Sequence, residues 1–287
     1  MDVSIIVPSF NTRALLARCL TSVFTSLKES DASYDVIVVD NASTDGSADL
    51  VRKKFPQVHV VCNRENVGYG RANNQAINIA KGKYILLLNS DIVVQNDAIE
   101  ALYRFIKDKK KVFAGGKLFN VDGSAQPSCG PFFTIPFVAL MLFAKGDLWG
   151  ATRGSPNTAK LVDWVSGACL MGEKRAFEDV GLFDEGIFMY MEDIDFLYRA
   201  RKKGYGVLFC SDARFTHAGA GSSGQRRTPV VNIYRGLMYF YRKHHGPASC
   251  ATIRFMLIAK ALAAIIVGRI MNKRDLSLIY EEAIRVV

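Results

Sequence analysis

The chain has 287 residues, of which 49% are hydrophobic and 22% are charged, and its net charge at pH 7 is +10. This composition excludes a mainly disordered chain and allows one large domain, or a core domain with an appendage. The six cysteines are scattered without a Cys-x-x-Cys pair, which argues against a zinc cage or a disulfide framework. Residues 225–287 carry eleven Lys or Arg and three Asp or Glu, so most of the excess charge lies there.

Strands and helices alternate through the first hundred residues. Apolar, β-branched segments predict strands at Ser4–Pro8, Asp35–Asp40, Val58–Cys62 and Tyr84–Leu88, and helical spacing predicts helices ending near Leu27 and spanning Arg71–Ala80. This alternation predicts an α/β fold with a mostly parallel sheet flanked by helices. Ligands bind beyond the carboxyl ends of the strands in such sheets, where the sequence places Asp40 and the run Asn89, Ser90 and Asp91.

The second half of the chain has a less regular pattern. Its features are an apolar stretch at Phe132–Phe143, a Gly/Ser loop at Gly146–Pro156, short strands at Leu161–Val165 and Val207–Cys210, an acidic cluster at Asp184–Asp195, a Gly/Ser loop at Gly219–Gly224, and helices at Val230–Arg242 and Ile253–Met271. The N-terminus enters a strand at once, so we expect no cleaved secretion signal. The apolar runs, including Phe255–Val267, are shorter than the roughly 20 residues that span a bilayer.

Three carboxylates and one imidazole follow apolar runs or lie in the acidic cluster: Asp40, Asp91, Asp193 and His217. This set suits a nucleotide diphosphate site. A carboxylate and an imidazole hold a divalent metal against the pyrophosphate, and a second carboxylate takes a proton from an acceptor. A lone histidine after a strand is more often structural, and Asp40 could instead cap a helix.

Six motifs occur in a recognisable order. They are Val3–Asn11, Val38–Ser47, Asn66–Asn74, Leu88–Asp91, Met191–Phe196 and His217–Gly219. Over roughly residues 1–225, this order resembles the family 2 glycosyltransferases, which are inverting enzymes of the GT-A fold. The details resemble the branch that contains bacterial rhamnosyltransferases. The resemblance implies a GT-A type, Rossmann-like, mostly parallel sheet flanked by helices, here followed by a C-terminal helical extension.

The resemblance assigns donor-binding roles to the N-terminal motifs. Asp40 would accept a hydrogen bond from the imide N–H of uracil or thymine. The other nucleotide-sugar-binding residues would be Pro8 and Phe10 in the base pocket, Asn66, Gly68 and Arg71 in the loop below the nucleotide, and Asn89 and Ser90. Either base-pocket residue could instead simply shape its turn. The run beginning at Gly68 lacks the third glycine of the dinucleotide fingerprint, which excludes a nicotinamide site.

The resemblance also assigns the metal and the catalytic base. Asp91 would bind Mn²⁺ or Mg²⁺ between the donor phosphates, with His217 as a second ligand, and Mn²⁺ tolerates imidazole better. Asn89 stands where other members have aspartate, which leaves Asp91 as the main carboxylate. Asp193 would be the general base of an inverting displacement, and Glu192 would contact the acceptor or orient its loop.

Trp164 and Gly167 match a family segment near the donor sugar and the acceptor. Gly167 would let the backbone approach a sugar ring, and Trp164 would offer a flat apolar face. A buried strand with a packed tryptophan is an equally good interpretation.

Three parts are predicted. Residues 1–110 form the nucleotide-sugar-binding half, residues 111–228 form the acceptor-binding and catalytic half of the same domain, and residues 229–287 form a basic helical extension. The coincidence of charge and apolar surface in this extension favours attachment to an anionic membrane, which would place the protein in the cytoplasm on the inner face of the cell membrane. Packing on the core or in a homodimer is the alternative, and no nucleic-acid recognition motif is present.

The expected reaction is sugar transfer from a dTDP or UDP donor to a lipid-linked or polysaccharide hydroxyl, and the branch suggests dTDP-rhamnose. A sugar nucleotidyltransferase is the first alternative, but it should carry a basic glycine-rich loop where this chain has Pro8-Ser9-Phe10-Asn11. A non-catalytic membrane-associated nucleotide-binding scaffold is the second. It is disfavoured because the chain retains Asp91, Asp193 and His217.

Overall fold

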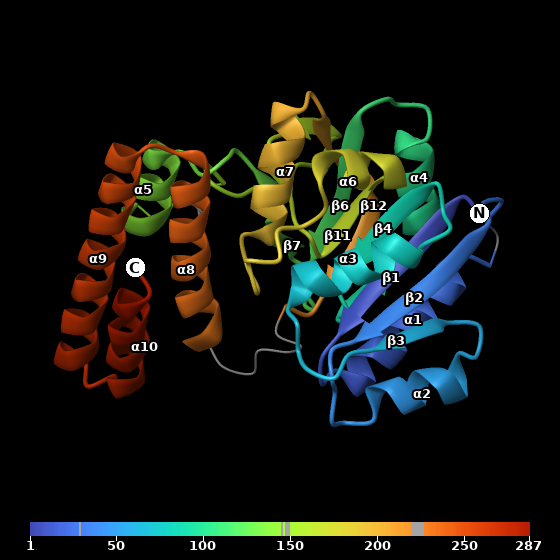
Figure 1. Cartoon of the computed structure of the whole chain (residues 1–287), viewed down its shortest axis with the longest axis horizontal. Helices are drawn as coiled ribbons and strands as arrows, with labels where there is room; N and C mark the ends of the chain where they lie inside the picture. The colour runs from blue at the N-terminus through green and yellow to red at the C-terminus, as the bar shows by residue number, and fades with distance from the viewer. Residues whose placement is uncertain (29, 145, 147–149, 220–226) are drawn as a thin grey trace.

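A computed structural model of the chain describes residues 1–28, 30–144, 146, 150–219 and 227–287, and it shows a sheet domain beside a group of helices (Figure 1). The helices are α1 (Arg13–Ser26), α2 (Ser47–Lys54), α3 (Tyr69–Ile79), α4 (Ala98–Ile106), α5 (Ile135–Phe143), α6 (Lys174–Val180), α7 (Glu192–Lys202), α8 (Arg227–His244), α9 (Pro247–Ile270) and α10 (Arg274–Arg285). The strands are β1 (Val3–Ser9), β2 (Tyr34–Asp40), β3 (His59–Cys62), β4 (Tyr84–Leu88), β5 (Ile92–Val94), β6 (Val112–Phe119), β7 (Ala125–Gln126), β8 (Cys129–Gly130), β9 (Lys160–Val162), β10 (Trp164–Val165), β11 (Cys169–Glu173) and β12 (Gly206–His217).

The main sheet is mixed and mostly parallel. Its strand order is β3-β2-β1-β4-β11-β6-β12-β5. The strands β3, β2, β1 and β4 are parallel, β11 runs antiparallel between β4 and β6, and β12 is parallel to β6. Every residue of β1 and β4 is buried, because apolar side chains cover both faces of the sheet. The predicted α/β class and the four predicted N-terminal strands are confirmed, although β3 begins one residue later than expected.

Two central strands were not predicted from the sequence, because glycines interrupt their apolar pattern. β6 contains Gly115 and Gly116, and β11 contains Gly172. A Cβ at Gly115 would lie 2.6 Å from the Cβ of Val165, and one at Gly172 would lie 2.4 Å from the Phe113 ring. Close packing of neighbouring elements therefore requires residues with low strand propensity here. The predicted strand at Leu161–Val165 is divided into β9 and β10, and the predicted Gly219–Gly224 loop lies outside the described residues beyond Gly219.

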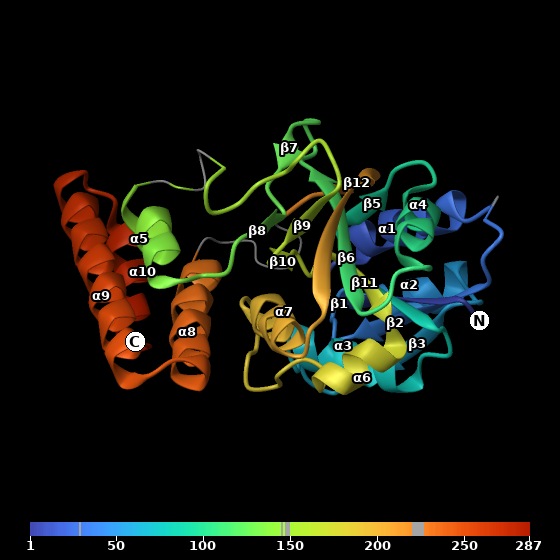
Figure 2. The same ribbon diagram turned by 90° about the horizontal axis from the view of Figure 1, so that it is seen from above.

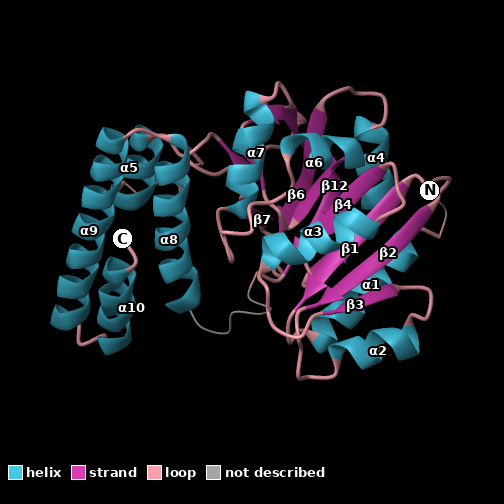
Figure 3. Ribbon diagram, viewed as in Figure 1, coloured by secondary structure: helices cyan, strands magenta, loops and turns pink. Residues whose placement is uncertain are grey.

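The C-terminal helices form a group with α5, beside the sheet domain. Figure 3 shows helices alone in this part, and Figure 2 shows α8 between α7 and α9. One face of α9 packs inward through Ile253, Leu257, Ala261 and Ile265, at the spacing of an amphipathic helix. Its opposite face exposes Phe255, Leu262, Ile266 and Ile270.

Helix α9 is longer than the apolar run that marks it in the sequence. It has 24 residues, and an 18-residue window within it has a mean hydropathy of 2.0 and is only 22% buried. By length and composition this helix could cross a bilayer, which corrects the expectation that the segment is too short. The difference arises because Pro247 begins the helix well before the apolar run.

Candidate active site

A cleft of about 620 Å³ lies beyond the carboxyl ends of β1 and β4. The predicted residues that line it are Pro8, Phe10, Asn66, Asn89, Ser90, Asp91, Trp164, Gly167, Glu192, Asp193 and His217. A larger hollow of about 1060 Å³ between α1 and α4 contains none of the predicted residues. The cleft is therefore the candidate active site.

Asp91 and His217 approach each other inside this cleft. β12 pairs antiparallel with β5, and the register that joins His217 to Ile92 brings the imidazole beside Asp91. The Asp91 Oδ1 atom is 3.2 Å from His217 Nε2, and Asp91 Oδ2 accepts a hydrogen bond of 3.0 Å from the Gly219 N–H. Burial acts to raise the pKa of Asp91, but the interactions with His217 and Gly219 outweigh it and hold the pKa below its usual value.

The donor set fits a divalent cation bound together with phosphates. One carboxylate oxygen and one imidazole nitrogen face each other, and the Asn89 amide nitrogen lies 3.3 Å from the same His217 Nε2. Among the described residues, no group of three or more His, Cys, Asp or Glu converges on one point. The protein thus offers two ligands, and a diphosphate and water would have to supply the others.

Asp193 and Glu192 begin helix α7 at the wall of the cleft. Asp193 Oδ2 accepts a hydrogen bond of 2.9 Å from the Gly167 N–H, and its Oδ1 accepts one of 2.8 Å from the Ile194 N–H. Burial raises the pKa of Asp193 and, together with the neighbouring Asp193 charge, raises the pKa of Glu192 to about 8. Glu192 Oε2 is buried and lacks a hydrogen-bond partner within the described part of the chain. A carboxyl group with a raised pKa is suited to accept a proton near neutral pH.

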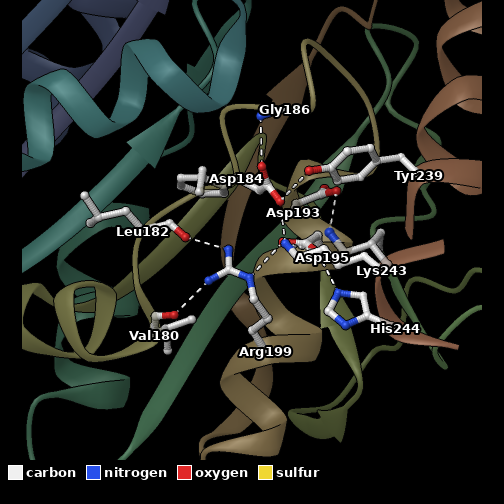
Figure 4. Close-up of polar contacts among 12 residues, drawn as sticks. Val180, Leu182, Asp184, Gly186, Asp193, Asp195, Arg199, Tyr239, Lys243 and His244 are labelled. Carbon is white, nitrogen blue, oxygen red and sulfur yellow. Dashed lines mark hydrogen bonds and ion pairs between the residues drawn. The ribbon is translucent and has the colours of Figure 1, made fainter. Parts of the chain in front are cut away.

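The third carboxylate of this helix is structural. Asp195 is completely buried, and its oxygens contact Arg199 Nε at 2.8 Å, His244 Nε2 at 2.7 Å and Lys243 Nζ at 2.9 Å (Figure 4). Burial acts to raise the pKa of Asp195, and these hydrogen bonds lower it below its usual value. Because Lys243 and His244 belong to α8, the network ties the start of α7 to the C-terminal helices.

Asp40 does not line the cleft, but it lies beside Ser9, which does, and it carries an unpaired acceptor. Asp40 Oδ2 accepts a hydrogen bond of 3.0 Å from the Ser43 N–H, whereas its buried Oδ1 has no partner among the described residues. Helix α2 begins only at Ser47, so Asp40 does not cap it. Asn66 Oδ1 accepts a hydrogen bond of 3.0 Å from the Gly68 N–H, which shapes the next loop. The free oxygen of Asp40 suits a donor such as a base imide.

Some predicted residues lie differently from the expected arrangement. Arg71, like Asp40 and Gly68, is not among the residues that line the cleft. Arg71 pairs at 3.4 Å with Glu185 on the surface. Trp164 is 4% exposed and stacks on Phe133, so the packed-tryptophan interpretation describes it better than an open sugar platform. Gly167 turns its backbone N–H to Asp193.

Several residues of the cleft were not predicted from the sequence. The Gln126 Oε1 atom lies 2.8 Å from His217 Nδ1, so it can orient the imidazole. Tyr69 donates a hydrogen bond of 2.6 Å to the Gly167 carbonyl. Arg153 brings a cation, and an apolar wall adds Phe133, Met141, Ile233 and Leu237. Tyr69 lies within the Asn66–Asn74 motif, although no role was assigned to it. The other residues lie outside the six motifs, so spacing could not identify them.

The fold is of the GT-A type. Residues 4–130 match the model described as Glycosyl transferase family 2. It is 28% identical over 254 residues to the N-acetylglucosaminyl-diphospho-decaprenol L-rhamnosyltransferase of Mycobacterium tuberculosis, covering 79% of this chain and 81% of that protein. It is also 28% identical over 181 residues to the low-salt glycan biosynthesis hexosyltransferase Agl10 of Haloferax volcanii, covering 61% and 56% of the two chains.

Solved structures share the fold. The mannosyltransferase from Pyrobaculum calidifontis in complex with GDP-Man and Mn²⁺ superposes with a TM-score of 0.60 and 17% identity, covering 99% of this chain and 85% of that one. GalNAc-T7 with UDP, GalNAc and Mn²⁺ also has a TM-score of 0.60 and 17% identity, covering 84% and 50%. The predicted GT-A fold is confirmed.

Proposed function

We propose that this enzyme transfers rhamnose from dTDP-rhamnose, with inversion, to a hydroxyl of a lipid-diphosphate-linked sugar, using Mn²⁺ or Mg²⁺. The observation that carries the proposal is that Asp91, His217 and Asp193 line one cleft. The similarity to a rhamnosyltransferase whose name includes a diphospho-decaprenol acceptor supports the choice of both substrates.

Residues in the cleft and beside it each take one part of the reaction. Asp40 Oδ1 accepts a hydrogen bond from the thymine imide and holds the base. Asp91 and His217 would hold the cation, which would neutralise charge on the leaving diphosphate. Asp193 takes the proton of the acceptor hydroxyl while that oxygen forms the new bond to the anomeric carbon. The bond from this carbon to the diphosphate breaks on the opposite face, and the diphosphate leaves with the electron pair.

Glu192 limits the negative charge of the Glu192–Asp193 pair. Its raised pKa leaves much of this carboxyl neutral at pH 7, so the pair carries less than two negative charges near the donor phosphates. The Gly167 N–H fixes the Asp193 carboxylate in one orientation. A neutral Glu192 can also donate a hydrogen bond to an acceptor hydroxyl.

We further propose that α9 attaches the enzyme to the inner face of the cell membrane. Its exposed apolar face includes Phe255, Ile266 and Ile270, with Arg254 and Arg269 on the same helix. Co-sedimentation with vesicles containing anionic lipid tests this proposal, and binding should weaken as salt increases. Equal amounts in the pellet with and without vesicles would contradict it.

A donor panel tests the proposed reaction. The purified chain is given Mn²⁺, a short lipid-diphosphate-linked GlcNAc and, in turn, dTDP-rhamnose, UDP-glucose, UDP-galactose or GDP-mannose, and release of the nucleoside diphosphate is followed. We expect the highest turnover with dTDP-rhamnose. A higher turnover with any of the other donors would refute the rhamnose assignment.

A further inference from the structure

The cleft continues past the carboxylates into an apolar groove. Its wall is formed by Phe133, by Met141 of α5, and by Ile233 and Leu237 of α8. None of these side chains has a role in the transfer chemistry described above. A groove of this kind, joined to an active site, suits an apolar part of a substrate.

Helix α5 is apolar throughout, although most of its side chains are not fully buried. All nine of its residues, Ile135–Phe143, are apolar, and only Val138 is fully buried. The helix packs against α9, and Figures 1 and 2 both show the two side by side. Partly exposed apolar side chains of α5 therefore lie between the cleft, which Met141 lines, and helix α9.

Arg153 supplies a cation where the groove meets the active site. Its Nε atom is buried and has no hydrogen-bond partner in the described part of the chain. Its guanidinium lies 5.8 Å from the centre of the Trp164 ring, which holds it against the cleft wall. Its positive charge acts to lower the pKa of the nearby Asp193. An unsatisfied buried donor of this kind is suited to an anionic ligand, because guanidinium pairs well with phosphate oxygens.

The charge of the surrounding helices has the same sign. Helices α5, α8 and α9 contain no Asp or Glu, whereas α8 and α9 contain Lys and Arg. An anionic head group with an apolar tail would therefore meet no like charge along these helices.

We propose that Arg153 binds the diphosphate of the acceptor and that the groove between α5 and α8 binds the first isoprene units of its lipid. The inference rests on the proposed lipid-linked acceptor and locates that acceptor in the cleft. The acceptor sugar then lies on the Asp193 side of its diphosphate, with the lipid leaving the cleft along α5 toward α9. Arg153 acts in this arrangement as a residue that binds and positions the acceptor.

Farnesyl diphosphate tests the site without any transfer reaction. Its binding to the full chain is measured by calorimetry, with no donor present. We expect Arg153→Gln to weaken binding about tenfold or more, since a charge-assisted pair is lost. Met141→Ser should also weaken it several-fold, whereas Phe143→Ser, on the same helix but outside the cleft, should not. Circular dichroism melting identifies any variant that fails to fold. Met141→Leu, which keeps an apolar side chain, should bind farnesyl diphosphate as tightly as wild type.

The outcomes separate this inference from the proposed reaction. Unchanged farnesyl diphosphate binding in both Arg153→Gln and Met141→Ser overturns the site, even if transfer to a lipid-linked acceptor is observed. A parallel loss of dTDP binding in Arg153→Gln also overturns it, because the arginine would then serve the donor. Normal farnesyl diphosphate binding, with the expected losses in the variants but no sugar transfer to any lipid-linked acceptor, refutes the proposed reaction and leaves the site standing.

Discussion

Asp91 Oδ1 lies 3.2 Å from His217 Nε2 because the antiparallel register of β5 and β12 joins His217 to Ile92. Two motifs that are far apart in the sequence thus provide one pair of candidate metal ligands. The metal function proposed for this pair depends on the position of the imidazole, and Gln126 holds the other ring nitrogen at 2.8 Å.

The first prediction concerns this supporting residue. Gln126→Leu should lower Mn²⁺ affinity in the presence of dTDP by about 10–100-fold, because the partner that orients a ligating imidazole is lost. Mn²⁺ binding is followed by electron paramagnetic resonance. Asp91→Asn should lower the affinity further, and Asp212→Asn, at an exposed position on the same strand as His217, is the matched control. Wild-type affinity in Gln126→Leu would contradict the role of Gln126 in positioning the imidazole.

The second prediction concerns the dependence of stability on pH. Burial and Asp193 raise the pKa of Glu192 from 4.5 to about 8, so between these values the folded state binds more protons than the unfolded state. Glu192 therefore makes stability fall as pH rises through this window. In Glu192→Gln this titration is absent. The melting temperature of Glu192→Gln minus that of wild type should increase steadily from pH 5 to pH 8. A difference that stays constant with pH would be inconsistent with a raised pKa of Glu192.

The third prediction separates steric contact from backbone strain at Gly68. Gly68 has φ +86°, and a Cβ there would lie 2.4 Å from the Phe188 carbonyl oxygen. Gly123 has φ +84° and no atom within 4 Å of such a Cβ. Gly123→Ala should lower the free energy of unfolding by about 1–2 kcal/mol, the cost of placing an alanine in the left-handed region. The free energy of unfolding, measured with urea, should fall clearly more in Gly68→Ala, and this variant should also weaken dTDP binding. Equal losses of free energy in the two variants would exclude a role for the contact with Phe188.

The fourth prediction concerns the buried Asp195. Asp195→Asn removes the charge that compensates Arg199, Lys243 and His244, so unfolding by urea should show a loss of about 3–5 kcal/mol. The exposed Asp179–Lys203 pair is the control, and Asp179→Asn should cost less than about 1 kcal/mol. If both variants lost the same free energy, the network would not anchor α7 to α8.

The sequence predicts the N-terminal half of the fold well, because parallel strands buried on both faces appear as continuous apolar runs such as Ile5–Val7 and Ile85–Leu88. It does not reveal β6 or β11, where Gly115 and Gly172 are required by neighbours that are distant in the chain. Tertiary packing, which sequence periodicity does not encode, determines these strands.

The same contrast holds for the site. Asp91, Asp193 and His217 belong to motifs, and the fold places all three around one cleft. Gln126 and Arg153 have no motif, and long-range contacts to His217 and Trp164 bring them to the cleft. Arg71 belongs to a motif but pairs with Glu185 on the surface, because an exposed carboxylate lies within its reach.

The most direct measurement of the central claim is single-turnover sugar transfer by Asp193→Asn, compared with wild type at saturating dTDP-rhamnose, Mn²⁺ and lipid-linked acceptor. Loss of the general base should lower the transfer rate by about 10²–10⁴-fold, while dTDP binding measured by calorimetry stays within about twofold of wild type. A transfer rate equal to that of wild type would contradict the assignment of Asp193 as the base, and with it the account of catalysis in this cleft.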